Sequence, residues 1–283
     1  MNVLVTGAGG QVGRELVELC IAEGDDVTAA DHARLDVTDR DAVLQLCQAV
    51  RPAAIIHAAS WTAVDACESD PERAHAVNAA GAGYVAEAAK EVGAHLVHIS
   101  TDYVFDGTKP TPYDESDVPN PMSEYGRSKW AGEQAVAAVS DDAAVVRISW
   151  VCGRYGNNMV KTLLRLAADG VDPKFVDDQI GHPTIVADLV PVLRRFALEH
   201  RGGLFHVTNQ GAVSWFEFAR AVFKAAGADV ARVGPISTKE LDPPRPAPRP
   251  ANSVLDNAAL RRLGWPLLPH FEESLHQLVR ELV

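Results

Sequence analysis

Cysteine is scarce in this sequence, and patterns that bind metal are missing from it. The four cysteines, Cys20, Cys47, Cys67 and Cys152, are scattered and form no Cys-x-x-C pair, and the ten histidines show no His-Glu-x-x-His spacing. The sequence therefore predicts no zinc site. Isolated thiols of this kind are typical of reduced, mostly buried side chains, so we expect a cytoplasmic protein.

Positive charge is also scarce relative to negative charge. Lys and Arg number 26 against 38 Asp and Glu, which gives a formal net charge of −12. This balance excludes nucleic acid and anionic membrane surfaces as expected partners, so local donors must hold any anionic cofactor or substrate. No apolar run approaches the length of a membrane span. The first residues indicate a strand rather than a basic segment followed by an apolar one, so we expect no signal peptide.

A glycine-rich turn follows the apolar, β-branched residues 2–6. Gly7, Gly10 and Gly13 have the spacing G-x-x-G-x-x-G, with Gly9 as an extra glycine, and a helix is expected over 14–22. Glycines placed between a strand and a helix allow a sharp turn and a close approach to a pyrophosphate. The helix N-terminus adds free N–H groups and partial positive charge. The segment predicts a dinucleotide cofactor.

The residue that ends the second strand bears on the choice of cofactor. A strand is expected over 26–30 and ends in Asp31. A carboxylate at this place can bond the ribose 2′-hydroxyl and repel a 2′-phosphate, which favours NADH. Arg34 could instead pair with that phosphate, so NADPH stays open.

Strand and helix patterns alternate through the first half of the chain. Strands are expected over 53–57, 95–99 and 143–148, and helices over 71–92 and 124–139. This alternation predicts an α/β protein, a doubly wound parallel sheet with helices on both faces. Ligands of such sheets bind beyond the carboxyl ends of the strands, where the candidate residues of this chain also fall.

Two parts of unequal size are expected. Residues 1–150 would form the dinucleotide-binding (Rossmann) domain, with returns near 185–210 and in a C-terminal helix, and residues 151–255 would form most of a smaller substrate-binding lobe. The proline-rich segment 242–250 predicts a rigid, extended stretch. A linker or a polyproline ligand are alternatives, but the order that resumes at 253–257 favours a loop of the smaller lobe.

Tyr125 and Lys129 form a Tyr-x-x-x-Lys pair within the helix expected over 124–139. Residues four apart lie on one face of a helix. An ammonium beside a phenol stabilises the phenolate, so we expect Lys129 to lower the pKa of Tyr125. Such a phenol exchanges a proton with an alcohol or carbonyl oxygen. The spacing alone is weak evidence, and the glycine turn strengthens it.

At these residues the chain resembles the extended short-chain dehydrogenases/reductases and, among them, the dTDP-4-dehydrorhamnose reductase family. The resemblance runs nearly end to end. Its most specific part is the string Ser-Thr-Asp-Tyr-Val-Phe-Asp-Gly at residues 100–107. Further matching segments are 5–13, 35–39, 62–65, 125–129, 149–151, 156–158, 178–181 with 183–184, and 249–253.

The resemblance implies NAD(P)H-dependent reduction of the C4 ketone of dTDP-4-dehydro-6-deoxy-L-mannose (dTDP-4-dehydrorhamnose) to dTDP-L-rhamnose. It implies the catalytic set Thr101, Tyr125 and Lys129, with Thr101, Asp102 and Trp150 at the sugar. The expected cofactor-binding residues, from the motifs and the resemblance together, are Gly7, Gly10, Gln11, Val12, Asp31, Asp36, Val37, Ala58, Ala59, Ser60, Thr62, Tyr125 and Lys129.

The family is usually homodimeric, sometimes with a metal ion such as Mg²⁺ between subunits. Glu15 falls where one metal carboxylate would be, but the other ligands cannot be placed. An exposed charge in the first turn of a helix is therefore the better interpretation of Glu15.

Several candidates also have plain structural interpretations. Thr101 or Asp102 could cap the loop after a strand, and Trp150 could be a packing residue. A structural role is favoured for Asn78. Asp65 and Glu68 could be solvated, and Arg249 could either steer the nucleotide phosphates or be exposed.

Three rival functions remain at this stage. The protein could be a 4-ketoreductase for another nucleotide 6-deoxysugar, with the same catalytic residues. It could be a non-catalytic regulator like the β subunit of methionine adenosyltransferase, although a regulator does not need Thr101, Tyr125 and Lys129 together. An epimerase or dehydratase would keep NAD bound and consume no cofactor.

Overall fold

Six parallel strands form the central sheet, in the order β10-β5-β4-β3-β1-β2. Their bounds are Asn2–Thr6 (β1), Asp26–Ala30 (β2), Ala54–His57 (β3), His95–Thr101 (β4), Ala144–Ile148 (β5) and Gly203–His206 (β10) in the computed structural model, which describes residues 1–283. The strand order reverses at β1 and β3, and a crevice for ligands opens at such a switch point. The predicted doubly wound parallel sheet is confirmed.

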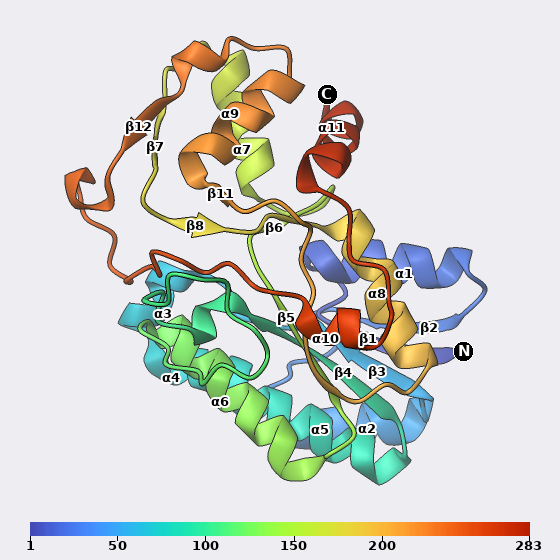
Figure 1. Ribbon diagram of the computed structural model, residues 1–283. Helices are drawn as coiled ribbons and strands as arrows, with labels where there is room; N and C mark the ends of the chain where they lie inside the picture. The colour runs from blue at the N-terminus through green and yellow to red at the C-terminus, as the bar shows by residue number, and fades with distance from the viewer.

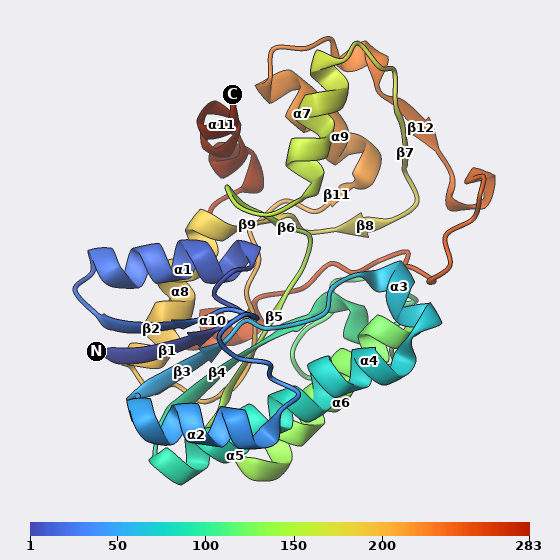
Figure 2. The same ribbon diagram turned by 180° about the vertical axis from the view of Figure 1, so that it is seen from behind.

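Helices cover both faces of the sheet (Figures 1 and 2). On one face α1 (Gln11–Ala22) packs beside α8 (Val186–Leu198), and on the other lie α2 (Arg40–Val50), α5 (Gly81–Val92) and α6 (Glu124–Val139). Each layer has its own apolar core: Leu16 and Phe196 belong to the first, Val85 and Val136 to the second. Burial of both faces explains why the central strands β1, β3 and β5 are mostly apolar.

The long helix expected over 71–92 is present, with a π-helical turn inside it. It consists of α4 (Pro71–His75), the π turn Ala76–Ala80 and α5. The buried Asn78 lies in that turn, and its Oδ1 accepts hydrogen bonds from Ser60 Oγ (3.0 Å) and Trp61 N (2.8 Å). Single π-helical turns inside α-helices are frequent at functional sites. The structural role expected for Asn78 is confirmed: it holds the loop after β3.

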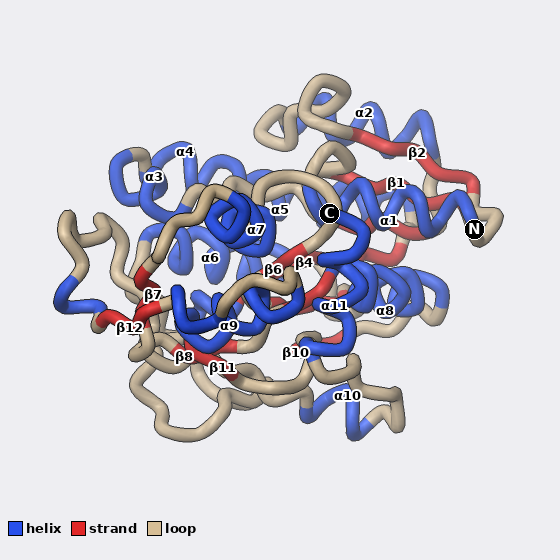
Figure 3. The backbone as a smooth tube through the Cα atoms, turned by 90° about the horizontal axis from the view of Figure 1, so that it is seen from above, coloured by secondary structure: helices blue, strands red, loops and turns tan.

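A smaller lobe lies above the sheet in Figure 1 and projects over β4 and α6 in Figure 3. Its helices are α7 (Met159–Ala168), α9 (Trp215–Ala225) and α11 (Phe271–Leu282). Short paired strands complete it: β6 (Val151–Cys152) with β9 (Thr184–Ile185), β7 (Lys174–Val176) with β12 (Gly234–Ile236), and β8 (Ile180–Gly181) with β11 (Val213–Ser214).

The chain crosses between the two parts several times. Helix α8 and strand β10 belong to the larger part, and α10 (Ala258–Arg262) does too. The C-terminal helix differs from the expectation that it rejoins the sheet, because Phe271 and Leu275 on its apolar face pack with Phe218 of α9 in the core of the smaller lobe. None of the helices combines the length and apolarity that a membrane crossing requires.

The proline-rich segment runs from the smaller lobe back to the larger part, towards α3 (Val64–Ser69), as Figure 1 shows. Arg249 pairs there with Asp65, and Asn252 N donates a hydrogen bond to Gly107 O (3.3 Å). The segment is thus an ordered tie between the two parts rather than a free linker.

Candidate active site

Two adjoining cavities open at the carboxyl ends of the strands, with volumes of about 470 and 420 Å³. They share Gly10, Ala58 and Ser60. Every expected site residue lines one of them. The first cavity takes in Gly7, Gly10, Asp31, Asp36, Val37, Ala58, Ala59 and Ser60, and the second takes in Gly10, Gln11, Val12, Ala58, Ser60, Thr62, Thr101, Asp102, Tyr125, Lys129 and Trp150.

The glycine turn fits the cradle that a pyrophosphate needs. Gly7 has φ +68°, and a Cβ on it would lie 2.5 Å from Ala59 N, so only glycine lets β1 turn this close to the loop after β3. Helix α1 begins at Gln11 rather than at Arg14, directly after the N-cap Gly10. Its free N–H groups therefore meet the boundary between the cavities, where an anion would be stabilised.

The polar groups of the first cavity come from the loops after β2 and β3. Asp31 Oδ1 accepts a hydrogen bond from Arg34 N (3.1 Å), while the Arg34 guanidinium donates to Ala29 O (2.9 Å) and does not line the cavity. Sequence reasoning missed several residues that line this cavity, among them His32, Leu35 and Arg73. The Arg73 guanidinium lies 4.7 Å from the ring centroid of Trp61, a cation–π contact between elements that no local pattern relates.

Tyr125 and Lys129 lie one turn apart near the start of α6, and both are buried in the second cavity. Ser123 caps this helix by accepting a hydrogen bond from Gly126 N (3.1 Å), and Glu68 accepts one from Glu124 N (2.7 Å), so Glu68 is not simply solvated. Lys129 Nζ donates to Ile99 O (2.7 Å) at the end of β4.

Burial controls the charge of both groups. It raises the pKa of the Tyr125 phenol above its ordinary value, and the neighbouring Thr101 hydroxyl offsets this only in part. Burial also lowers the pKa of Lys129 to about 8. The expectation that Lys129 lowers the pKa of Tyr125 was therefore wrong for this structure, because desolvation of the phenolate outweighs the neighbouring charge.

Thr101 and Asp102 follow one another at the end of β4. Thr101 Oγ1 donates to Asp102 Oδ1 (3.0 Å) and accepts from Tyr103 N (3.2 Å), so it caps the short turn over Asp102–Val104 and also lines the second cavity. Burial raises the pKa of Asp102 to about 6. Thr101 thus caps the turn after β4, as its structural interpretation expected, and its side chain also belongs to the site.

Trp150 follows β5 with a left-handed backbone (φ +44°), which costs energy for a bulky residue and is frequent at functional sites. Its indole stacks on Trp215, with ring centroids 3.7 Å apart and planes 10° apart. Trp215 is the first residue of α9 and lines the second cavity, a role that its sequence neighbourhood does not indicate.

Glu15 is buried, in contrast to the exposed charge expected. Its Oε1 accepts a hydrogen bond from Arg154 N (2.7 Å), and burial raises its pKa. The chain contains no group of three or more His, Cys, Asp or Glu side chains that could hold a metal ion.

Comparison with known proteins places this site in a family. A family model described as the RmlD substrate binding domain matches residues 1–283. A dTDP-4-dehydrorhamnose reductase from Mycolicibacterium smegmatis is 43% identical over 285 residues, which cover all of this chain and 86% of that protein. The chain belongs to the dTDP-4-dehydrorhamnose reductase family.

Other similar proteins agree with this family. The crystal structure of a dTDP-4-dehydrorhamnose reductase from Bacillus anthracis, in complex with NADP, has 42% identity and a TM-score of 0.94, with 99% of this chain and 98% of that chain covered. A dTDP-4-keto-6-deoxy-D-glucose reductase from Streptomyces niveus is 38% identical, over 97% of this chain and 95% of that protein. Members of the family thus carry names that differ in the keto-sugar.

Proposed function

We propose that the protein reduces the C4 ketone of dTDP-4-dehydrorhamnose with NADH or NADPH and so forms dTDP-L-rhamnose. The observation that carries this proposal is the meeting of Thr101, Tyr125 and Lys129 with the glycine turn in two adjoining cavities. Family membership supports the substrate, and the reductase in complex with NADP supports the cofactor.

The nicotinamide, when bound, supplies the hydride to the C4 carbon, and the protein supplies position and protons. Negative charge then grows on the carbonyl oxygen. Tyr125 gives that oxygen its proton, and the Thr101 hydroxyl, which donates to Asp102 in this structure, turns to donate a second hydrogen bond to it. The raised pKa of Tyr125 suits this role, because the buried phenol keeps its proton until the alkoxide forms. Lys129 uses a remaining N–H for the cofactor ribose.

Asp102 and Trp150 complete the proposed sugar-binding wall beside Thr101. The cofactor would lie along Gly7, Gly10, Gln11 and Val12, the acids Asp31 and Asp36 with Val37, and the loop of Ala58, Ala59, Ser60 and Thr62. Asp31 favours NADH, because its carboxylate would repel the 2′-phosphate of NADPH. The Arg34 guanidinium, which could pair with that phosphate, is hydrogen-bonded to Ala29 O instead.

The Streptomyces niveus relative favours a second candidate substrate, another dTDP-4-keto-6-deoxysugar. The deciding experiment uses purified protein, each reduced cofactor in turn, and dTDP-4-dehydro-L-rhamnose or its epimers, with identification of the product. We expect stoichiometric cofactor oxidation and dTDP-L-rhamnose. Tightly bound NAD without net oxidation would overturn the proposal in favour of an epimerase or dehydratase. No turnover with any keto-sugar would favour a regulator.

A homodimer and a cytoplasmic location are further proposals. All four cysteines are unpaired, which fits a reducing compartment. Light scattering of the purified protein measures the assembly, and fractionation of cells measures the location.

A further inference from the structure

A carboxylate and a guanidinium lie buried behind Lys129, and the mechanism above does not use them. Glu133 follows Lys129 by one turn of α6 and so shares its face of the helix. Arg147 comes from β5. Their side chains are only 5% and 1% exposed. Buried charges of this kind are costly unless they are fully paired, so their partners matter.

The Glu133 carboxylate is held from two strands. Arg147 Nε donates to Oε1 (2.9 Å) and Arg147 Nη2 to Oε2 (2.6 Å), a bidentate pair, and Ser100 Oγ donates to Oε1 (2.5 Å). Ile99, the residue before Ser100, accepts the hydrogen bond from Lys129 Nζ. Consecutive residues of β4 thus fix two opposite charges of α6.

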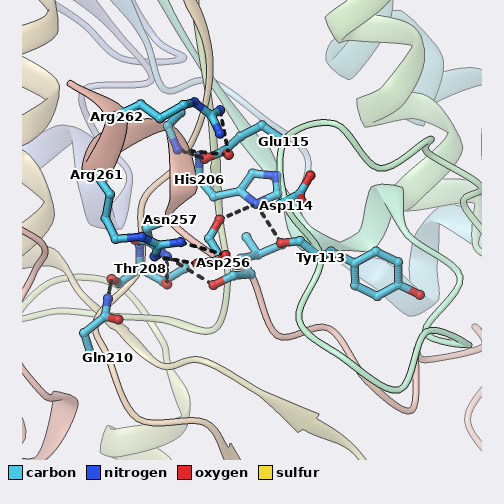
Figure 4. Close-up of polar contacts among 12 residues, drawn as sticks. Tyr113, Asp114, Glu115, His206, Thr208, Gln210, Asp256, Asn257, Arg261 and Arg262 are labelled. Carbon is cyan, nitrogen blue, oxygen red and sulfur yellow. Dashed lines mark hydrogen bonds and ion pairs between the residues drawn. The ribbon is translucent and has the colours of Figure 1, made fainter.

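The network continues away from the cavities and fixes Arg147 as well. The His206 ring lies 3.4 Å from Arg147 Nη1, and its Nδ1 lies 3.1 and 3.2 Å from the carbonyl oxygens of Tyr113 and Asp256 (Figure 4). The Arg147 guanidinium also lies over the Phe105 ring, 5.1 Å from its centroid. Glu133 is therefore held in place, one helical turn from Lys129, by groups that are themselves fixed.

Three other titratable groups near Lys129 offer it no negative charge at neutral pH. His57 of β3 and His98 of β4 are buried, and the charge of Lys129 helps to lower their pKa, so both are neutral. The Tyr125 phenol is protonated. Burial lowers the pKa of Lys129, and Glu133 is the charged group that raises it.

We propose that Glu133 is a positioning residue of the reductase site, whose carboxylate, fixed by Arg147 and Ser100, is the counter-charge that keeps Lys129 an ammonium ion at the cofactor. The inference rests on the proposed role of Lys129. The Glu133 carboxylate then balances two positive charges: that of Arg147 on β5, which is structural, and that of Lys129 on α6, which is functional.

The test separates these two duties. Glu133→Gln removes the charge but leaves Arg147 buried and unpaired, so it is expected to destabilise the fold. The double variant Glu133→Gln/Arg147→Met removes both charges and should recover part of the lost melting temperature. Glu124→Gln makes the same chemical change on the same helix at a half-buried carboxylate and serves as the matched control.

The readouts are the pH dependence of kcat/KM and of NADH binding by fluorescence. Activity and binding should fall as pH rises through the pKa of Lys129, about 8 in the parent protein. In both Glu133 variants this fall should move to lower pH by about one unit or more, and Glu124→Gln should leave it in place. Glu133→Asp keeps a carboxylate at this position, so its pH profile should lie between those of Glu133→Gln and the parent protein.

A double variant that melts near the parent temperature and keeps the parent pH profile would overturn the inference and leave Glu133 a purely structural role. The binding profile needs no turnover. If the parent protein binds NADH but reduces no keto-sugar, the proposed function fails while the binding profile still decides the role of Glu133.

Discussion

Arg249 forms a bidentate ion pair with Asp65, which lies 184 positions earlier in the chain; the Nη1–Oδ1 and Nη2–Oδ2 distances are 2.5 and 2.7 Å. Asp65 Oδ1 also accepts a hydrogen bond from Ala247 N (3.1 Å). The pair ties the proline-rich segment to α3, beside Val64 and Tyr103 of the second cavity. Neither residue is simply solvated or free for phosphates, the roles that the sequence left open.

Breaking this tie should weaken substrate binding more than turnover. We expect Asp65→Asn to raise KM for the nucleotide sugar with a smaller change in kcat, and to lower the unfolding free energy by about 1 kcal/mol or less, because Asp65 is 40% exposed. Arg249 holds the pKa of Asp65 below its ordinary value, so this stabilisation is present above pH 4 or so and is lost as pH falls through the folded-state pKa. Steady-state kinetics and urea titrations at several pH values measure both effects.

Removing the phenol of Tyr125 should stop proton donation and little else. Tyr125→Phe is expected to lower kcat by about 10²–10⁴-fold while NADH affinity and melting temperature stay close to the parent values. Tyr113→Phe is the matched control, since that hydroxyl bonds Asp106 away from both cavities. Near-normal turnover of Tyr125→Phe would exclude the proposed proton donor.

The carboxylate of Asp31 should govern the choice between the two cofactors. We expect Asp31→Ala to raise the ratio of kcat/KM for NADPH to that for NADH about tenfold, equivalent to about 1.4 kcal/mol of removed repulsion. Asp36 is a second acid of the same cavity, but its Oδ1 is already bonded to Thr38 N (2.9 Å). Asp36→Ala should therefore affect both cofactors alike, and an unchanged ratio in Asp31→Ala would contradict the assignment.

The position of the Trp150 indole should depend on a glycine. A Cβ on Gly181 would lie 2.6 Å from Trp150 Cε2, so Gly181→Ala must displace the indole from its stack on Trp215. We expect a raised KM for the sugar nucleotide and altered tryptophan fluorescence. Gly83→Ala places its Cβ 3.4 Å from Ala135 Cβ within a helix and should change neither property.

Asp102 should make the protein less stable as pH rises. Its folded-state pKa of about 6 exceeds the ordinary 3.8, so the folded state binds the proton more tightly and loses stability between about pH 4 and pH 6. Asp102→Asn should therefore stabilise the fold at neutral pH by on the order of 2–3 kcal/mol and have no such effect below pH 4 or so, while activity falls.

The matched control for that effect is Asp106→Asn, because hydrogen bonds from Thr108 and Asn120 lower the pKa of Asp106. Asp106→Asn should destabilise the fold at neutral pH, which is the opposite of the effect expected for Asp102→Asn. Thermal melts of both variants across this pH range check the pair, and a destabilised Asp102→Asn protein at neutral pH would refute the prediction.

Much of the site was predictable because its signals are local. The glycine turn follows from steric demands at Gly7, the helix 124–139 has the bounds expected, and Tyr125 and Lys129 share a face through helical spacing alone. The start of α1 at Gln11 was missed, because glycine-rich residues give no helical periodicity before Arg14. The π turn at Asn78 was also missed, since alanine-rich sequence looks the same with or without it.

The sequence by itself determined the order of strands and helices, the edge of the sheet where ligands bind and the residues that reach it, because turn sterics and periodicity act between near neighbours. Only the tertiary structure decided which distant groups meet: Arg249 with Asp65, Trp215 with Trp150, Arg154 with Glu15, and the C-terminal helix with α9. It also decided the charge of Tyr125, because desolvation depends on everything packed around the phenol and not on the lysine four residues away.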